Sequence, residues 1–524
     1  MKRRTLLAAG AASLARPQIG RAQAARTVKF IPQADLTVLD PHWTTAYVTR
    51  NHGFMVFDTL YGQDGSYRSS PQMVEGHTVS DDGRTWRLTL RPGLRFHDDE
   101  PVRAQDCVAS IQRWGSRDGF GQALLAATDT LAADGDRVIV FRLKRLFPLL
   151  PDALGKSATY MPAMMPERLA RTPAATQVTE MVGSGPFRFL ANERVPGARV
   201  AYAKFDGYVP REGGVSDWTA GPKIVHVDRV EWTTTPDPAT AAAALQSGEA
   251  DWWDYAAADL LPLLRRTKGV KVAVQDPSGQ VAIMRMNQLQ PPFDNPAIRR
   301  ALLGAVDQAD FMQAIVGDPA LFHVPTGVFT PGTALASDAG MEVLTGRRDM
   351  GRVRADLKAA GYAGEKVVVL VATDFPVLKA MADVGADMLA RAGMDVDYQA
   401  LDWGTVLTRR TSKAPASANG WSAFFTAWAG TDMLTPAGHI SLRANGEDAW
   451  FGWPNSPRIE RLRNDWFAAT DAAAQKKVAE ALQIQALTDV PYVPLGQYLQ
   501  ATAYRETLSD VPNGFAIFWS VRKA

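Results

Sequence analysis

The chain has 524 residues, and 46% of them are hydrophobic. This length exceeds one hydrophobic core and this composition excludes general disorder, so we expect two or three folded domains. The 57 basic and 55 acidic residues are scattered and give a net charge of only +2 at pH 7, which argues against nucleic acid as a partner.

Residues 1–24 have the pattern of an export signal peptide. A basic start, Lys2-Arg3-Arg4, precedes a short, weakly apolar stretch. Ala22-Gln23-Ala24 matches an A-x-A cleavage site, so we predict cleavage after Ala24. The paired arginines fit either a twin-arginine or an ordinary secretory signal. The stretch is too short to span a bilayer.

Removal of this segment takes away five basic residues and no acid, which lowers the net charge from +2 to −3. Cys107 is the only cysteine, so an intramolecular disulfide is excluded. No cysteine lies at the cleavage site, where a lipid anchor would need one. We therefore expect a protein that is exported to a periplasm, freely soluble there and not lipid-anchored. We also expect it to be a monomer.

Hydrophobic patterns in the first half of the chain predict strands and helices in mixed order. The clearest strand is 84–90, because Trp86, Leu88 and Leu90 share one face. Further strands are predicted at 27–32, from Arg95, at 138–143 and at 224–232, and helices at 49–60, 104–114 and 239–245. The acids after His97 fit a helix-capping turn better than a metal site.

The second half opens with a strand at 281–286, after which Pro291-Pro292 forces a turn. Asn295 is a natural N-cap for a helix at 296–306, and a second helix follows at 307–317. Downstream we predict strands at 366–372, 396–401 and 424–428, and helices at 376–392, 457–470 and 471–487. The strand–helix–strand order from 366 to 401 indicates an α/β lobe.

Several motifs resemble those of the extracellular solute-binding proteins of the peptide/nickel ABC-transporter family. The longest, at 287–307, reads N-x-x-x-P-P-F-D-N-P-x-I-R-x-A-L-x-x-A-V-D. Shorter ones are R-x-G-x-x-F-H-D at 91–98, G-S-G-P-F at 183–187 and S-G-E-x-D at 247–251. Asp99 stands where the family usually has Gly. The resemblance covers nearly the whole mature chain and is weakest at 320–365 and 405–450. It also implies a return crossing to the first lobe at 491–495 and a closing strand at 515–519.

The resemblance implies an α/β fold, a two-lobed periplasmic binding protein of the large, three-subdomain type with a ligand cleft at the hinge. Lobe 1 is expected at 25–280 with an inserted subdomain at about 60–175, lobe 2 at 281–490, and the return to lobe 1 at 491–524. The implied function is that of an ABC importer's solute-binding subunit. It would capture a peptide-like or other small solute and deliver it to permease subunits in the inner membrane.

We predict that one set of residues contacts the ligand. Similarity to the family places Trp428 and its neighbours at the cleft, and Trp403 follows a strand end, where α/β sheets place ligands. Trp253 lies in an aromatic run that fits either a cleft mouth or a core. The full predicted set is Tyr47, Trp253, Asn287, Trp403, Trp428, Gly430, Thr431 and Asp432.

One difference from the family bears on the ligand. Peptide binders commonly carry W-x-A-D-Y, whose Asp holds the α-ammonium of a peptide. Here the run is W-A-G-T-D at 428–432, and we interpret Gly430 as standing in the acidic position. An ammonium buried without a carboxylate is costly, so we expect that a standard dipeptide is not the preferred ligand. An opine, a heme, a sugar, a metal chelate, or a small cationic or neutral amide remain open.

The sequence offers little for catalysis. Its seven histidines are scattered without metal-ligand spacing, which also disfavours nickel, and no nucleophile motif is recognisable. We predict no catalytic residue, no bound metal, no cofactor and no enzyme activity. The alternative is a secreted hydrolase or transferase that uses the same cleft, because a triad assembled in space leaves no local motif.

Overall fold

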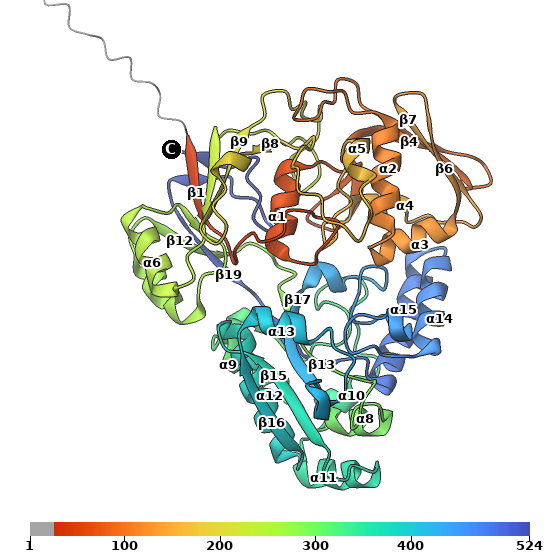
Figure 1. The fold of residues 1–524 in the computed structure, drawn as a ribbon, viewed down its shortest axis with the longest axis vertical. Helices are drawn as coiled ribbons and strands as arrows, with labels where there is room; N and C mark the ends of the chain where they lie inside the picture. The colour runs from red at the N-terminus through yellow and green to blue at the C-terminus, as the bar shows by residue number, and fades with distance from the viewer. Residues whose placement is uncertain (1–25) are drawn as a thin grey trace, which may run out of the picture.

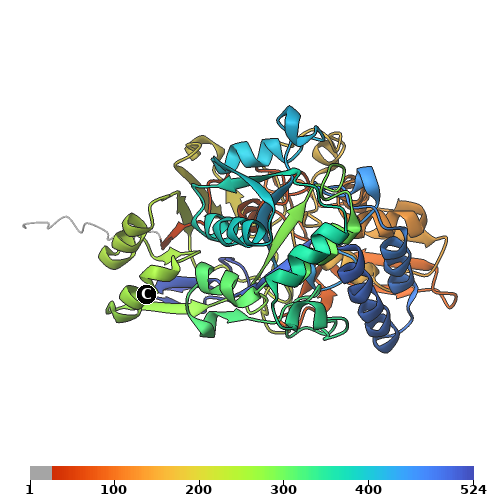
Figure 2. The same ribbon diagram turned by 90° about the horizontal axis from the view of Figure 1, so that it is seen from below.

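The computed structural model describes residues 26–524, so the predicted signal peptide and its cleavage site lie outside the described residues. The described chain is an α/β protein with sheets of seven, six and four strands and two pairs of short strands. In Figure 1 the six-stranded sheet and its helices lie at the bottom, and the other two large sheets lie above it on opposite sides. Figure 2 shows the same arrangement from below.

The seven-stranded sheet has the order β12-β19-β11-β1-β10-β9-β8, in which β1 runs parallel to both neighbours. Trp252 and Trp253 are adjacent on β11, so they point to opposite faces of the sheet. Trp252 joins the core that contains helix α1, and Trp253 joins the core beneath α6 and α7. The elements are β1 (Thr27–Ile31), α1 (Tyr47–Val56), β8 (Phe187–Phe189), β9 (Arg199–Lys204), β10 (Arg229–Thr233), α6 (Pro238–Ser247), β11 (Trp252–Trp253), α7 (Leu261–Arg266), β12 (Val270–Val274) and β19 (Ala501–Arg505).

The four-stranded sheet is an antiparallel unit inserted into the first lobe, with the order β4-β5-β7-β6. Its strand β5 confirms the prediction from alternation, since Trp86, Leu88 and Leu90 are all buried. The elements are β4 (Val74–Val79), β5 (Thr85–Leu90), α2 (Ala104–Gly115), α3 (Gly119–Ala127), β6 (Thr128–Asp134), β7 (Val138–Leu143), α4 (Leu150–Gly155) and α5 (Glu167–Ala170). The short pair β2 (Tyr61–Gln63) and β3 (Ser69–Pro71) precedes it.

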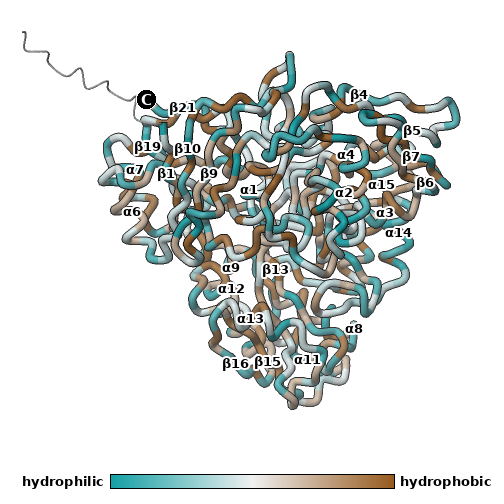
Figure 3. The backbone as a smooth tube through the Cα atoms, turned by 45° about the horizontal axis from the view of Figure 1, so that its top comes forward, coloured by the Kyte–Doolittle hydropathy of each residue, from teal (hydrophilic) through white to brown (hydrophobic). Residues whose placement is uncertain are grey.

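The six-stranded sheet, in the order β14-β18-β13-β17-β15-β16, forms the second lobe. Its strand β15 is buried on both faces and lies in a hydrophobic stretch of the chain, brown in Figure 3. Asn295 caps α8 as predicted, accepting a hydrogen bond from the backbone N of Ala297. The strands are β13 (Gln280–Met286), β14 (Phe322–His323), β15 (Lys366–Ala372), β16 (Asp395–Leu401), β17 (Ala423–Ala429) and β18 (Val493–Tyr498).

Helices cover this sheet and extend one side of the lobe. They are α8 (Pro296–Leu303), α9 (Gln308–Ile315), α10 (Glu342–Thr345), α11 (Met350–Ala359), α12 (Pro376–Arg391), α13 (Trp403–Arg409), α14 (Pro457–Ala468) and α15 (Ala472–Asp489). Phe467 of α14 packs against Phe120 and Phe147 of the four-stranded unit, so the two lobes also meet through an apolar contact far from the hinge.

Two crossings join the lobes. Residues 275–279 connect β12 to β13, and residues 499–500 connect β18 to β19. Because β12 pairs with β19 and β13 pairs with β18, the crossings run side by side. Strand β18 still belongs to the six-stranded sheet, so the chain returns to the first lobe after residue 498, later than the boundary predicted at 491.

Several predicted element limits were wrong for identifiable reasons. The first helix spans Tyr47–Val56 rather than 49–60, because Phe57 is already extended. Residues 515–519 form no strand, although most of their side chains are buried. Phe518 packs its ring against Phe30 and Trp252, so this apolar run covers a sheet face instead of joining an edge. The strand predicted from 224 begins only at Arg229, and Arg95 makes a single bridge to Pro101.

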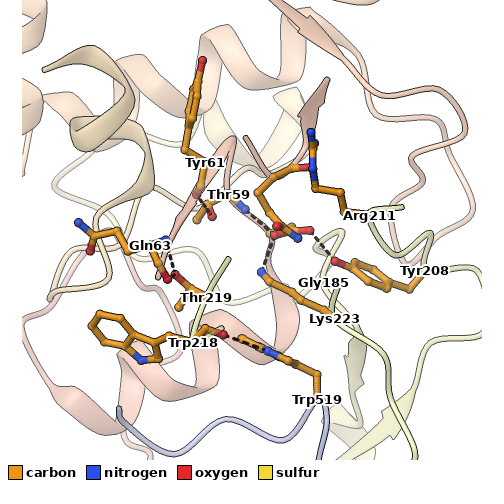
Figure 4. A network of polar contacts seen from close by, with 12 residues as sticks. Thr59, Tyr61, Gln63, Gly185, Tyr208, Arg211, Trp218, Thr219, Lys223 and Trp519 are labelled. Carbon is orange, nitrogen blue, oxygen red and sulfur yellow. Dashed lines mark hydrogen bonds and ion pairs between the residues drawn. The ribbon is translucent and has the colours of Figure 1, made fainter. Parts of the chain in front are cut away.

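A buried ion pair ties three distant segments of the first lobe together. Lys223 Nζ lies 2.7 Å from Asp58 Oδ1, and both side chains are fully buried. Tyr208 donates a hydrogen bond of 2.9 Å to the other oxygen of Asp58. Figure 4 shows Lys223 and Tyr208 pointing toward the same carboxylate, with Trp519 of the C-terminal segment nearby. Lys223 also lies 4.7 Å from the Trp519 ring.

We expect Asp58→Ala to lower the free energy of unfolding by about 3–5 kcal/mol, because it leaves the Lys223 ammonium unpaired in the interior. Urea denaturation of purified protein measures this. The control is Asp387→Ala, which breaks an exposed ion pair with Arg391 and should cost less than about 1 kcal/mol. Equal losses in the free energy of unfolding for the two variants would contradict a stabilising role for the buried pair of Asp58 and Lys223.

Candidate functional site

A cavity of about 310 Å³ lies between the two lobes. One wall comes from the four-stranded unit of the first lobe, from the segments that follow α2 and α4. The opposite wall comes from the loop between β17 and α14 in the second lobe. The lining residues are Ser116, Arg117, Asp118, Gly119, Gln122, Lys156, Thr159, Tyr160, Ala437, Gly438, Ile440, Arg443, Asp448, Ala449 and Trp450.

The charges on these walls leave the cavity with unpaired positive groups. Lys156 and Asp118 form a buried ion pair and neutralise each other. Arg117 donates to the backbone oxygen of Trp43 at 3.1 Å and also interacts with the Tyr160 hydroxyl. Arg443 reaches across to the first lobe, where its Nη1 donates to Gln122 Oε1 at 2.8 Å. Within residues 26–524 neither of these arginines pairs with a carboxylate, and only the exposed Asp448 adds a further negative charge to the lining.

Asp432 joins the lobes at the hinge end of the second lobe. Its Oδ2 accepts a hydrogen bond of 3.0 Å from the Tyr47 hydroxyl. Its Oδ1 accepts from the backbone N and the Oγ1 of Thr159, at 3.1 and 2.7 Å. Tyr47 Oη also accepts from the backbone N of Ala429 at 2.5 Å. Burial, and then the negative charge of Asp432, raise the pKa of Tyr47 well above its ordinary value, so the hydroxyl stays protonated and donates.

Gly430 occupies a position with no room for a side chain. A Cβ at this residue would lie 2.1 Å from the carbonyl oxygen of Ser278 in the first crossing. Its backbone N donates to Gly279 O at 2.8 Å, and its oxygen accepts from Thr330 Oγ1 at 2.7 Å. Both backbone groups are therefore hydrogen-bonded within the protein, and the predicted ligand contact at Gly430 stays a prediction.

The interpretation of the W-x-A-D-Y comparison is wrong by one residue. Counted from Trp428, the family's Asp falls on Thr431, not on Gly430. The Oγ1 of Thr431 is buried and has no hydrogen-bond partner in the described chain. In this comparison the acidic position of the motif holds the neutral hydroxyl of Thr431, and the expectation about the amine stays a prediction.

The other predicted residues separate into two groups. Trp428 packs edge-on against Trp450 of the cavity wall, with ring centroids 5.2 Å apart, and its buried Nε1 has no partner in the described chain. Trp403 is partly exposed at the start of α13 and lies over Arg410. By contrast, Trp253 belongs to the core beneath α6. Asn287 is fully buried, and its amide bonds to Trp421 O and Leu289 N inside the second lobe.

The cavity walls were not among the predicted residues. Tyr160, Arg117, Arg443 and Trp450 come from segments without a family motif in this chain. The only signal was the aromatic run 450–453, W-F-G-W, which begins at the end of a region of weak resemblance. Aromatic side chains supply much of the contact area in ligand sites, so this run was a candidate in its own right.

The histidines do not gather into a site. Within residues 26–524, no three His, Cys, Asp or Glu side chains lie close enough to hold a metal ion. Burial lowers the pKa of His42, His52 and His439 to about 3 and that of His97 to about 4. These four imidazoles are therefore neutral core residues at pH 7. In the same part of the chain, no helix has the length and hydropathy needed to cross a membrane.

Comparisons with known proteins agree on one family. Residues 69–449 match the family model described as bacterial extracellular solute-binding proteins, family 5 middle. The chain is 37% identical to a probable peptide ABC transporter periplasmic-binding protein of Sinorhizobium fredii, over 99% of this chain and 98% of that one. It is 24% identical to the glutathione-binding protein of Pectobacterium atrosepticum, over 94% and 92% of the two chains.

A solved structure supports the same fold. The periplasmic binding protein DppA from Helicobacter pylori, in complex with the peptide STSA, superposes with a TM-score of 0.80. It shares 19% sequence identity and covers 95% of this chain and 98% of its own. The predicted resemblance and the two-lobed α/β fold are therefore confirmed.

The hydrogen bonds that Asp432 accepts from Tyr47 and Thr159 bridge the two lobes, so their loss should favour the open arrangement. We expect Tyr47→Phe to weaken the closed arrangement by about 1–2 kcal/mol, because Asp432 and Ala429 N lose a shared partner. Small-angle scattering without added ligand should then show a larger radius of gyration than the wild-type protein. Tyr362→Phe is the matched control, since that hydroxyl bonds to Glu365 O inside the second lobe. An unchanged profile for Tyr47→Phe would contradict the bridge.

The low pKa values of the buried histidines predict that the folded protein loses stability in acid. Their folded pKa values lie below the unfolded value of about 6.5, so their contribution to stability is present above pH 6.5 and is lost as pH falls toward 4. Asp254 acts in the opposite direction, because burial raises its pKa to about 7. Burial also raises the pKa of Asp106, Asp152 and Asp276, so these four carboxyls offset part of the contribution of the four histidines.

We expect the free energy of unfolding to fall between pH 6.5 and 4.5, by up to about 1.4 kcal/mol per pH unit for each uncompensated histidine. Urea denaturation at one-unit pH intervals measures the slope, and His52→Gln should reduce it. A flat or rising profile on acidification would show that these imidazoles titrate normally.

Proposed function

The chain belongs to family 5 of the bacterial extracellular solute-binding proteins, the periplasmic solute-binding subunits of ABC importers, and we propose that its solute lies in the cavity between the lobes. The observation that carries this proposal is that residues of both lobes line one cavity, while two antiparallel crossings that run side by side join the lobes. A solute held there contacts both walls, so it favours the closed state over the open one. Closure around the solute would present the protein to permease subunits in the inner membrane.

We propose lobe limits that follow the sheets. Lobe 1 would span 25–280, with the four-stranded unit inserted at about 60–175, and lobe 2 would span the chain from 281 through strand β18. The remaining residues would return to lobe 1. The mature protein would act as a monomer without a lipid anchor, released into the periplasm by cleavage after Ala24.

The solute is proposed to be small and peptide-like, with no requirement for a free α-amine. Asp432 is occupied by Tyr47 and Thr159, and Asp118 is paired with Lys156. Thr431 offers only a hydroxyl where peptide binders offer a carboxylate. No carboxylate buried in the cavity lining is therefore free to receive an ammonium group, and such a group gains little by entering.

The protein is proposed to return its solute unchanged rather than to act as a hydrolase or transferase. Its buried histidines are separate and neutral, and each fills a place in a core. A general base needs to reach the proton it removes, and the cavity lining contains no histidine and no cysteine.

The test compares small peptides with their N-acetylated forms by isothermal titration calorimetry, using protein refolded from denaturant to remove bound solutes. We expect acetylation to change the dissociation constant of any bound peptide by less than about threefold, because no carboxylate pairs with the amine. A loss above about tenfold on acetylation would refute the proposed ligand class. Recovery of an altered solute after incubation would refute the transport role.

A further inference from the structure

Arg410, directly after α13, lies in a box of aromatic rings. Its Cζ is 5.0 Å from the ring of Phe451, 5.3 Å from Trp450, 5.6 Å from Trp403 and 5.7 Å from Phe424. Its Nε is fully enclosed and has no acceptor. Within residues 26–524 the guanidinium makes no ion pair and no hydrogen bond, although five N–H groups are available to it.

A second arginine beside Trp450 shows what the protein does when it satisfies such a group. Arg285 is fully buried, and its Cζ lies 5.2 Å from the same indole ring. Its nitrogens donate to the backbone oxygens of Ser441, Trp450, Phe451 and Pro491 at 2.6–2.9 Å. Arg285 is thus a structural residue that holds the cavity wall in place. Arg410 has the same aromatic neighbour and none of the acceptors.

The box adjoins the cavity. Trp450 connects the box to the cavity, since its ring lies 5.3 Å from the Arg410 guanidinium and the residue also lines the cavity wall. Of the Arg410 nitrogens, only Nε is among the enclosed unpaired atoms of the described chain. Tyr160, which lines the cavity from the first lobe, lies near enough to Arg410 to affect the pKa of its guanidinium, so the box also faces the first lobe. Burial lowers the pKa of Arg410 to about 10, so the group still carries its positive charge at pH 7.

We propose that Arg410 and its four aromatic rings form a subsite for a carboxylate of the solute, at the Trp450 end of the interlobe cavity. A partly buried charge without a counter-ion is costly, and a solute carboxylate would remove that cost on binding. The planar guanidinium suits a planar carboxylate, which can accept two parallel N–H bonds. The rings hold the guanidinium by cation–π contacts and keep water from competing. This assignment rests on the proposed function.

The experiment measures binding by the stripped wild-type protein, Arg410→Met and Arg410→Lys. The probes are reduced glutathione and a set of N-acetylated dipeptides, each paired with its carboxamide. We expect the wild type to bind carboxylates at least about tenfold more tightly than the paired carboxamides. Arg410→Met should lose this preference, and Arg410→Lys should keep only part of it, because an ammonium lacks the planar fork.

Thermal unfolding of the stripped proteins gives a second readout that needs no ligand. If Arg410 is an uncompensated charge, Arg410→Met has the same melting temperature as the wild type or a higher one. A purely structural cation–π role predicts a lower one. The control is Arg352→Met, an exposed arginine on α11 whose side chain is 81% accessible, which should leave both the melting temperature and the binding unchanged.

The possible results distinguish a failure of the Arg410 subsite from a failure of the proposed solute-binding function. Binding of carboxylate and carboxamide with equal affinity, or unchanged carboxylate preference in Arg410→Met, overturns the subsite while the transport role stands. Failure of the wild type to bind any probe, charged or neutral, overturns both.

Discussion

The close approach of the turn at Gly430 to the first crossing is the constraint on which the site depends. The backbone at residue 430 lies so near the carbonyl oxygen of Ser278 that only glycine fits there. This contact seats the end of β17 directly on the hinge, and it fixes where the next two residues point. Asp432 then reaches Tyr47 and Thr159 of the first lobe, and Thr431 keeps a buried hydroxyl without a partner. Asp432, the acid near this turn, therefore holds the two lobes together through its hydrogen bonds to Tyr47 and Thr159.

The parts of the fold that could be predicted are those specified by local physics. Alternating apolar residues are sufficient for β5, and Asn295 followed by proline is sufficient for the start of α8. The run 515–519 shows the limit of that reasoning. Its aromatic side chains are buried as a strand's would be, but Phe518 contacts Phe30 and Trp252 through ring packing, without backbone pairing. Hydrophobicity indicates that a segment is buried and does not identify the surface that covers it.

The site was predictable only in part, because it depends on contacts between segments far apart in the chain. Tyr47 and Asp432 were both expected near the ligand, and they do meet, yet they bond to each other across 385 positions of sequence. A single sequence cannot distinguish a group that faces a solute from one that faces another side chain. The same uncertainty explains Asn287, whose place in a specific motif suggested ligand contact but whose amide completes the backbone pairing of the second lobe.

Polar groups that lack partners carry more information about the solute than polar groups alone. Several buried atoms elsewhere in the described chain are also unpaired, such as the ring nitrogens of His42 and the amide of Gln72, so an unpaired atom by itself marks nothing. Around Trp450 the pattern is different, because the indole nitrogen of Trp428 and the guanidinium of Arg410 are unpaired beside the same cavity-lining ring. Both belong to the second lobe. The first lobe faces them with Arg117 and the neutralised pair of Lys156 and Asp118. Under the proposed function, this asymmetry would give the second lobe the larger share in recognising the polar groups of the solute, with Arg117 as the contribution of the first lobe.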